Sequence, residues 1–219
     1  HGLPDDMALQ GVADIRLWAR VEALGVHDIS GELDAHDLQI SHVKGVHDYR
    51  FDADRLSGRF GWRRAGEEWQ LALQQLLVVQ GTHSWKTDNL SLAGLHREQA
   101  SYIQGVSTRI VLDGFGALLP LVPGLEPEDR KLLDGLQPSG LVEDLAFTLS
   151  SEGGATELDH FSARFTGLSI GESGVFPMID GLDGSVTGSL GAGTVTLDTR
   201  NAGIHDADLF RKVLSLDRM

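Results

Sequence analysis

The sequence predicts a mainly β protein: an open antiparallel sheet with one apolar face and a short helical insertion near residues 115–136. Two observations predict this fold. Apolar and polar residues alternate with period two through most of the chain, as in strands that bury one face. Glycine, present at 27 positions, recurs where these runs end, as tight turns require.

The first strand block covers residues 1–114. Residues 60–62 face residues 69–73 as a hairpin with Gly66 in the connection, which we place at residues 63–68, and residues 90–92 and 108–112 supply further strands. Between residues 11 and 25, apolar residues take every odd position from 13 to 21: Ala13, Ile15, Leu17, Ala19 and Val21. Trp18 stands on the polar side of that strand, which predicts either cover by another element or exposure at an interface.

Residues 115–140 interrupt the alternation. Pro127 stands at the first position of a helical pattern, acidic residues follow in its first turn, and Gly135 stands past its end. We therefore predict a short helix here, followed by a turn that contains Pro138 and Gly140.

The second strand block covers residues 141–219. Its alternating runs lie at residues 145–149, 161–165, 184–190 and 193–197, whereas residues 206–214 fit either a helix face or the start of a strand. We expect the two blocks and the insertion to form one continuous architecture within a longer chain.

Composition excludes several classes of function. The formal net charge of −14, from 18 basic and 32 acidic residues, argues against nucleic acid and against docking on anionic headgroups. The absence of cysteine excludes disulfides and thiolate metal sites. No apolar run reaches the roughly 18 to 20 residues of a membrane-spanning helix.

One sequence pattern would suit a hydrolase. Residues 167–171 match the Gly-x-Ser-x-Gly nucleophile turn, in which Ser169 would be the nucleophile at a junction between a strand and a helix. Residues 172–177 contain Gly174 and end on Pro177, a composition that disfavours the required helix. A turn between strands is the favoured interpretation, and a hydrolase is the third hypothesis.

The candidate metal and acid–base residues are better explained as ordinary hydrogen-bonded or solvent-exposed residues. The spacing of His27, His36, His42 and His47 fits no ligand pattern, so hydrogen-bonded or solvated histidines are favoured. Residues 180–184 lack the alternating oxygen ligands of a calcium loop. We therefore predict no catalytic residue, no metal, no cofactor and no enzymatic activity.

A resemblance emerges from residues in a fixed order. Leu132-Leu-Asp-Gly-Leu136-Gln-Pro138-Ser-Gly140-Leu, then Phe161-Ser-Ala-Arg-Phe165-Thr-Gly-Leu168 and Gly193-Thr-Val-Thr-Leu-Asp-Thr-Arg-Asn201, resemble the YhdP branch of the AsmA-like bacterial envelope proteins. The match covers about 90 residues, with Trp69 to Leu92 extending it more weakly. One departure is Met178 after Pro177, where the family commonly has Pro-Gly.

The resemblance implies an inner-membrane protein of Gram-negative bacteria, anchored by a transmembrane helix outside this segment. It further implies that the periplasmic sheet is elongated and curved, an open groove shaped like a folded taco, and that this apolar groove carries phospholipid between the inner and outer membranes. Envelope proteins are possible partners, and the family has no assigned catalytic residues. An apolar trough would remove most of the cost of exposing two acyl chains, which is on the order of 25 kcal/mol at about 0.8 kcal/mol per CH₂.

The predicted lipid contacts are the apolar residues of the alternating strands. A closed β-sandwich that serves as a structural or protein-interaction module is the alternative, because the same residues could fill a core. The predicted contacts are Ile15, Leu17, Val21, Phe60, Trp62, Leu71, Leu73, Ile110, Leu112, Phe147, Leu149, Phe165, Val186, Leu190, Val195 and Leu197.

Overall fold

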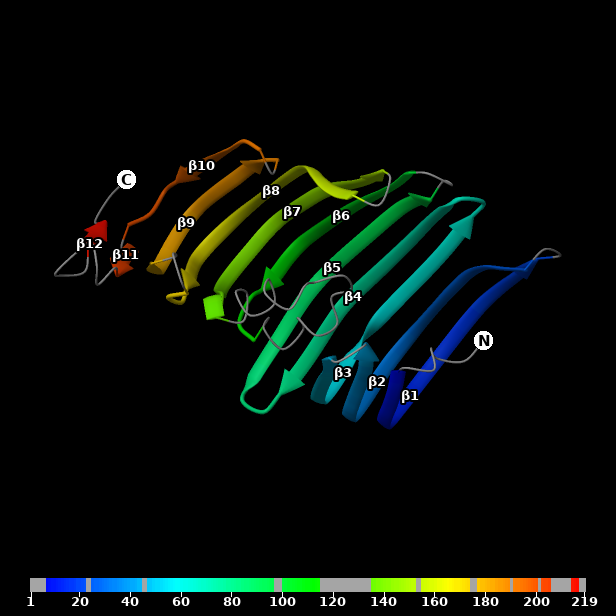
Figure 1. The fold of residues 1–219 in the computed structure, drawn as a ribbon. Coiled ribbons are helices and arrows are strands. Elements are labelled where there is room, and N and C mark those ends of the chain that lie inside the picture. Colours follow the sequence, from blue (N-terminus) through cyan, green and yellow to red (C-terminus); the bar gives the residue numbers. More distant parts are fainter. Residues whose placement is uncertain are drawn as a thin grey trace.

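A computed structural model describes most of the chain as one antiparallel sheet. The described residues are 7–22, 25–44, 47–96, 100–114, 135–152, 155–173, 177–189, 191–200, 202–205 and 214–216. The sheet has twelve strands in the order β1 to β9, then β11 and β12, with β10 paired to β9 (Figure 1). Strands that are consecutive in sequence up to β9 are neighbours in the sheet, so the chain forms a meander.

The first nine strands are long, and the last three are short. They are β1 (Met7–Glu22), β2 (Gly25–Lys44), β3 (His47–Ala65), β4 (Glu68–Gln80), β5 (His83–His96), β6 (Ala100–Val111), β7 (Ser139–Glu152), β8 (Ala155–Ile170), β9 (Met178–Gly188), β10 (Gly193–Leu197), β11 (Ala202–His205) and β12 (Leu214–Leu216). The prediction of a mainly β, open and curved antiparallel sheet is confirmed (Figure 1). The described strands form one open sheet and not the two packed sheets of a sandwich.

The predicted hairpin is formed by β3 and β4. Trp62 lies opposite Leu71 and Phe60 opposite Leu73, as the alternation requires. The turn is shorter than the predicted connection at residues 63–68, because pairing continues to Ala65 and Glu68. Gly66, with φ of 62°, takes the left-handed conformation that this tight turn needs.

Strand β6 joins the two strand blocks by pairing with β7, from Ala100 opposite Glu152 to Val111 opposite Leu141. Residues 115–134 lie outside the described residues, and with them most of the predicted helical insertion. Gly135 and Leu136 adopt a helical conformation. Residues 206–213 also lie outside, whereas β12 takes the strand alternative for Leu214.

A line of backbone irregularities crosses the sheet, and we call it the seam. Asp37, Gln75 and Asp144 have positive φ values of 50°, 52° and 49°, which are rare for residues other than glycine. On β2, the residues that face the apolar side change from odd-numbered to even-numbered at Asp37. Leu38 packs in one apolar cluster with Leu56, and Leu56 lies opposite Ala35, so Ala35 and Leu38 face the same side although they are three residues apart. Such single-residue reversals are the effect of β-bulges. They keep the apolar side chains of these long strands on one face.

On β5 and β6, the seam is stabilised by hydroxyl groups. The ladder between these strands is regular at Thr87 opposite Ile110 and again at Leu90 opposite Ser107, with irregular residues between. There, the hydroxyl of Thr87 donates to the carbonyl oxygen of Arg109 at 2.9 Å, and the hydroxyl of Ser107 donates to that of Asn89 at 2.8 Å. The two buried hydroxyls therefore satisfy carbonyl groups at the irregularity.

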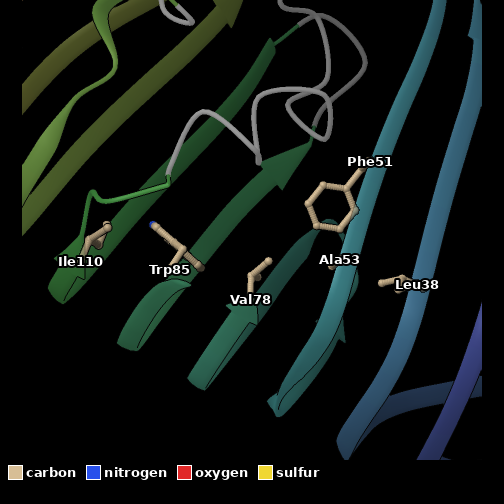
Figure 2. Close-up of a cluster of buried hydrophobic side chains, with 6 residues drawn as sticks. All are labelled: Leu38, Phe51, Ala53, Val78, Trp85 and Ile110. Carbon is tan, nitrogen blue, oxygen red and sulfur yellow. The ribbon is translucent and has the colours of Figure 1, made fainter. Parts of the chain in front are cut away.

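A cluster of buried side chains lies on one side of the seam, and we call it the buried end of the apolar face. Figure 2 shows its members projecting from neighbouring strands β2 to β6. Phe51 and Val78 are 2% and 4% exposed, and partly buried residues such as Val142 pack against them. The cluster consists of Leu38, Phe51, Ala53, Val78, Trp85 and Ile110.

Candidate functional site

On the side of the seam away from the buried end, rows of apolar side chains cross the sheet. Directly opposite residues of antiparallel strands point to the same face, so the strand register defines each row. One row runs from β1 to β9 through Ala19, Ile29, Trp62, Leu71, Leu92, Gly105, Phe147, Phe161 and Gly188. Every member is apolar or glycine, which makes the row a continuous apolar path across nine strands.

A second row runs beside the first, two residues closer to the seam on β1 to β7. It consists of Leu17, Gly31, Phe60, Leu73, Leu90, Ser107 and Leu145. Within the two rows, the side chains of β3, β4, β5 and β7 are half-buried. We call this region the half-buried end of the apolar face, and its surface is available to a ligand.

The predicted contact residues gather on the apolar face. Phe60, Trp62, Leu71, Leu73 and Phe147 belong to the two rows, and Ile110 belongs to the buried end. The register places on the same face Ile15, Leu17, Val21, Leu112, Leu149, Phe165, Val186, Val195 and Leu197. Leu190 lies outside the described residues. Contact of these residues with lipid stays a prediction.

Sequence reasoning missed part of the face. Leu90, Leu92 and Phe161 stand in runs that were recognised as strands, so the same alternation could have identified them. Phe51 and Trp85 were harder to find, because the parity reversal at the seam hides their relation to the neighbouring apolar residues.

The opposite face of β1, β2 and β3 carries charged side chains in pairs, and we call it the polar face. Arg55 donates two hydrogen bonds of 2.9 Å to the carboxylate of Asp34. Glu32 accepts from Arg59 at 3.1 Å and also lies 3.6 Å from Arg16. The hydrogen bond from Arg55 is the main cause that lowers the pKa of Asp34 below its usual range. These charges neutralise one another and form no cluster of a single sign.

A shallow depression of about 740 Å³ runs along these pairs, lined by Asp14, Glu32, Arg59 and Gln75 among others. Trp18, 55% exposed, lies on the same face between Arg16 and Arg20, so the alternative of cover by another element is wrong for it. The mixed charges suit solvent and give no preference for a charged ligand.

Ser169 is hydrogen-bonded to the neighbouring strand. Its hydroxyl donates to a carboxylate oxygen of Asp180 at 2.6 Å and accepts from the backbone N–H of Gly181 at 3.1 Å. Both partners lie on β9, so the serine connects β8 to β9 near the ends of the two strands. This is the strand-to-strand context favoured over the nucleophile turn.

Two kinds of feature are absent from the described part of the chain. Among those residues, no group of three or more histidine, aspartate or glutamate side chains is arranged to hold a metal ion. Within the same residues, no helix has the length and hydropathy needed to cross a membrane.

Comparison with known proteins gives one match. The sequence model of the family described as YhdP protein matches residues 2–219. That family consists of AsmA-like bacterial envelope proteins with a role in lipid transfer. No curated protein and no solved structure matches the chain.

Proposed function

We propose, from the premise that this chain belongs to the YhdP family of envelope lipid-transfer proteins, that its apolar face carries phospholipid acyl chains between the inner and outer membranes. The chain would be a segment of the periplasmic part of a protein anchored in the inner membrane. Phospholipid is then its ligand, and envelope proteins at either membrane are candidate partners. The proposed activity needs no catalytic residue and no cofactor.

The observation that carries this proposal is the uninterrupted apolar row from β1 to β9. With strands about 4.8 Å apart, the eight steps of that row span about 38 Å. Acyl chains on this path would keep apolar neighbours at each step, which avoids the cost of about 0.8 kcal/mol for each CH₂ exposed to water. Movement along the row would then need no large barrier.

Lipid mass spectrometry of the purified chain, with a pair of matched variants, tests the proposal. Leu149 is a half-buried residue of the apolar face, two positions beyond Phe147 on β7, whereas its neighbour Thr148 lies on the other face of the sheet, opposite Gln104. We expect co-purified phospholipid in the unaltered chain. Leu149→Asp should lower it about tenfold, since a carboxylate on the lipid path is costly to desolvate, whereas Thr148→Asp should leave it unchanged.

Two results would contradict the proposal. One is an unaltered chain that is free of extractable phospholipid. The other is equal lipid content in Leu149→Asp and Thr148→Asp, with both variants folded by circular dichroism.

A further inference from the structure

Aromatic side chains on the apolar face repeatedly lie opposite glycines. In each of four strand pairs, one aromatic residue is directly opposite a glycine of the neighbouring strand. The pairs are Gly31 with Phe60 on β2 and β3, Trp69 with Gly94 on β4 and β5, Gly105 with Phe147 on β6 and β7, and Phe165 with Gly184 on β8 and β9, where Phe161 also lies opposite Gly188. The arrangement therefore recurs in every second strand pair.

Each ring lies 3.0 Å or less from the position of a Cβ atom on its glycine, although at Gly31 and Gly184 a backbone carbonyl oxygen lies closer still. A Cβ atom on Gly94 would overlap the indole of Trp69, and one on Gly105 would overlap the ring of Phe147. A Cβ on Gly31 would lie 2.8 Å from the Phe60 ring. The rings therefore lie across the neighbouring strand, and they cover Gly31 and Gly105 well enough to bury them.

A ring that lies across the sheet presents its broad face to whatever rests on the sheet. Aliphatic side chains at the same positions would stand as separate ridges, because side chains project nearly perpendicular to the sheet. Aromatic faces offer a large contact area with little conformational freedom to lose on binding. The glycines thus keep the surface low and smooth.

We propose that the three half-buried rings, Phe60, Trp69 and Phe147, form the contact floor for the hydrocarbon chains of the lipid, and that their opposing glycines are positioning residues that hold the rings against the sheet. Phe165 is 8% exposed, so its ring belongs to the buried part of the face and not to this floor. This inference rests on the proposed function and adds which groups touch the ligand. Successive pairs lie two strands apart, or about 9.6 Å across the sheet, and are also displaced along the strands by two to four residues. An acyl chain that crosses the sheet obliquely would therefore pass from one ring to the next.

Tryptophan quenching tests the contact directly in single-tryptophan chains, made by replacing the other three tryptophans with phenylalanine. The ligand is a phosphatidylglycerol with brominated acyl chains, because bromine quenches indole emission only on close approach. We expect quenching of the chain that retains Trp69 on the apolar face. The matched chain that retains Trp18, on the polar face, should keep its emission.

Substitution of a glycine tests the positioning role. Gly94→Ala should weaken binding of a pyrene-labelled phosphatidylglycerol about tenfold, because the added methyl group lifts the Trp69 ring from the sheet. The nearest atoms to that methyl group belong to the indole and not to the backbone, so the fold can accommodate the change. Gly61→Ala is the control, since its Cβ has no atom within 4 Å.

The outcomes separate this inference from the proposed function. If the unaltered chain fails to bind the pyrene-labelled lipid, the proposed function fails. If lipid binds but Trp69 is quenched no more than Trp18, the floor is elsewhere and the inference is overturned. Equal affinities of folded Gly94→Ala and Gly61→Ala would overturn the positioning role. If Gly94→Ala does not fold, the quenching comparison still decides the contact.

Discussion

The two ends of the apolar face have similar side chains and different surroundings. At the buried end, Phe51 is 2% exposed and Val78 is 4% exposed, whereas Phe60 and Leu73 at the other end are half-buried. The seam lies between them on each strand, for example at Gln75 of β4. The comparison teaches that apolar character alone does not assign a role, since the side chains of one end are sealed and those of the other keep exposed surface.

The largest expected effect compares aromatic deletions at the two ends. Phe51→Ala should lower the free energy of unfolding by about 3 to 5 kcal/mol, because it leaves a cavity in a buried cluster. Phe60→Ala should cost only about 1 to 2 kcal/mol, because its ring is already partly hydrated. Urea denaturation followed by circular dichroism measures both. Equal losses would mean that the two ends do not differ in stability.

The next effect concerns the seam that separates the ends. Thr87→Val keeps the side-chain shape but removes the hydroxyl that donates to the carbonyl oxygen of Arg109. Because that hydroxyl is buried and bonded, we expect a loss of about 1 to 3 kcal/mol in unfolding free energy. Thr108→Val is the control, since Thr108 is exposed. A loss no larger than that of the control would show that the hydroxyl bond contributes little to the seam.

A smaller effect of opposite sign is expected at Gln75. Glycine adopts positive φ without the strain that a Cβ atom causes, so Gln75→Gly should stabilise the chain by about 1 kcal/mol. The neighbouring substitution Gln74→Gly, in regular strand opposite Asn89, should destabilise it by a similar amount. Thermal unfolding compares the two. Destabilisation by both would mean that the backbone at Gln75 is not strained.

The smallest expected effect concerns the polar face, which contains neither end of the apolar face. Folding lowers the pKa of Asp34 through its hydrogen bonds with Arg55, so the pair stabilises the native state above the usual aspartate pKa of 3.8. That stability is lost as pH falls below this value and the carboxylate takes up a proton. The pair is exposed, so the change is small and weakened by salt. Asp34→Asn should flatten the acid limb of a stability–pH curve between pH 5 and 2, and an unchanged limb would contradict the assignment.

Much of the sheet was predictable because its local pattern is strong. The odd-numbered apolar residues from Ala13 to Val21 define the apolar side of β1, and residues 60–62 were correctly predicted to face residues 69–73 in a hairpin. The family resemblance was also recognisable from ordered residues such as Pro138 and Gly140, and the match over residues 2–219 confirms it.

The seam was not predictable, because it results from backbone conformations that alternation does not encode. Asp37 and Asp144 are ordinary polar residues in a polar–apolar pattern, and only their positive φ values reveal the reversal of parity. The aromatic–glycine pairs were hidden for a related reason. Gly105 and Phe147 are far apart in sequence, and only the pairing of β6 with β7 brings the ring over the glycine.

By itself, the sequence determined the strands, the identity of their apolar side chains and the mainly β class, since period two is a local property that each strand carries alone. Whether the sheet is open or closed was decided by the tertiary structure. The tertiary structure decided where each strand reverses its parity, which apolar residues are sealed and which keep exposed surface. Those features depend on the register between strands and on how the side chains of neighbouring strands pack against one another. Both arise from contacts between residues that are distant in the chain.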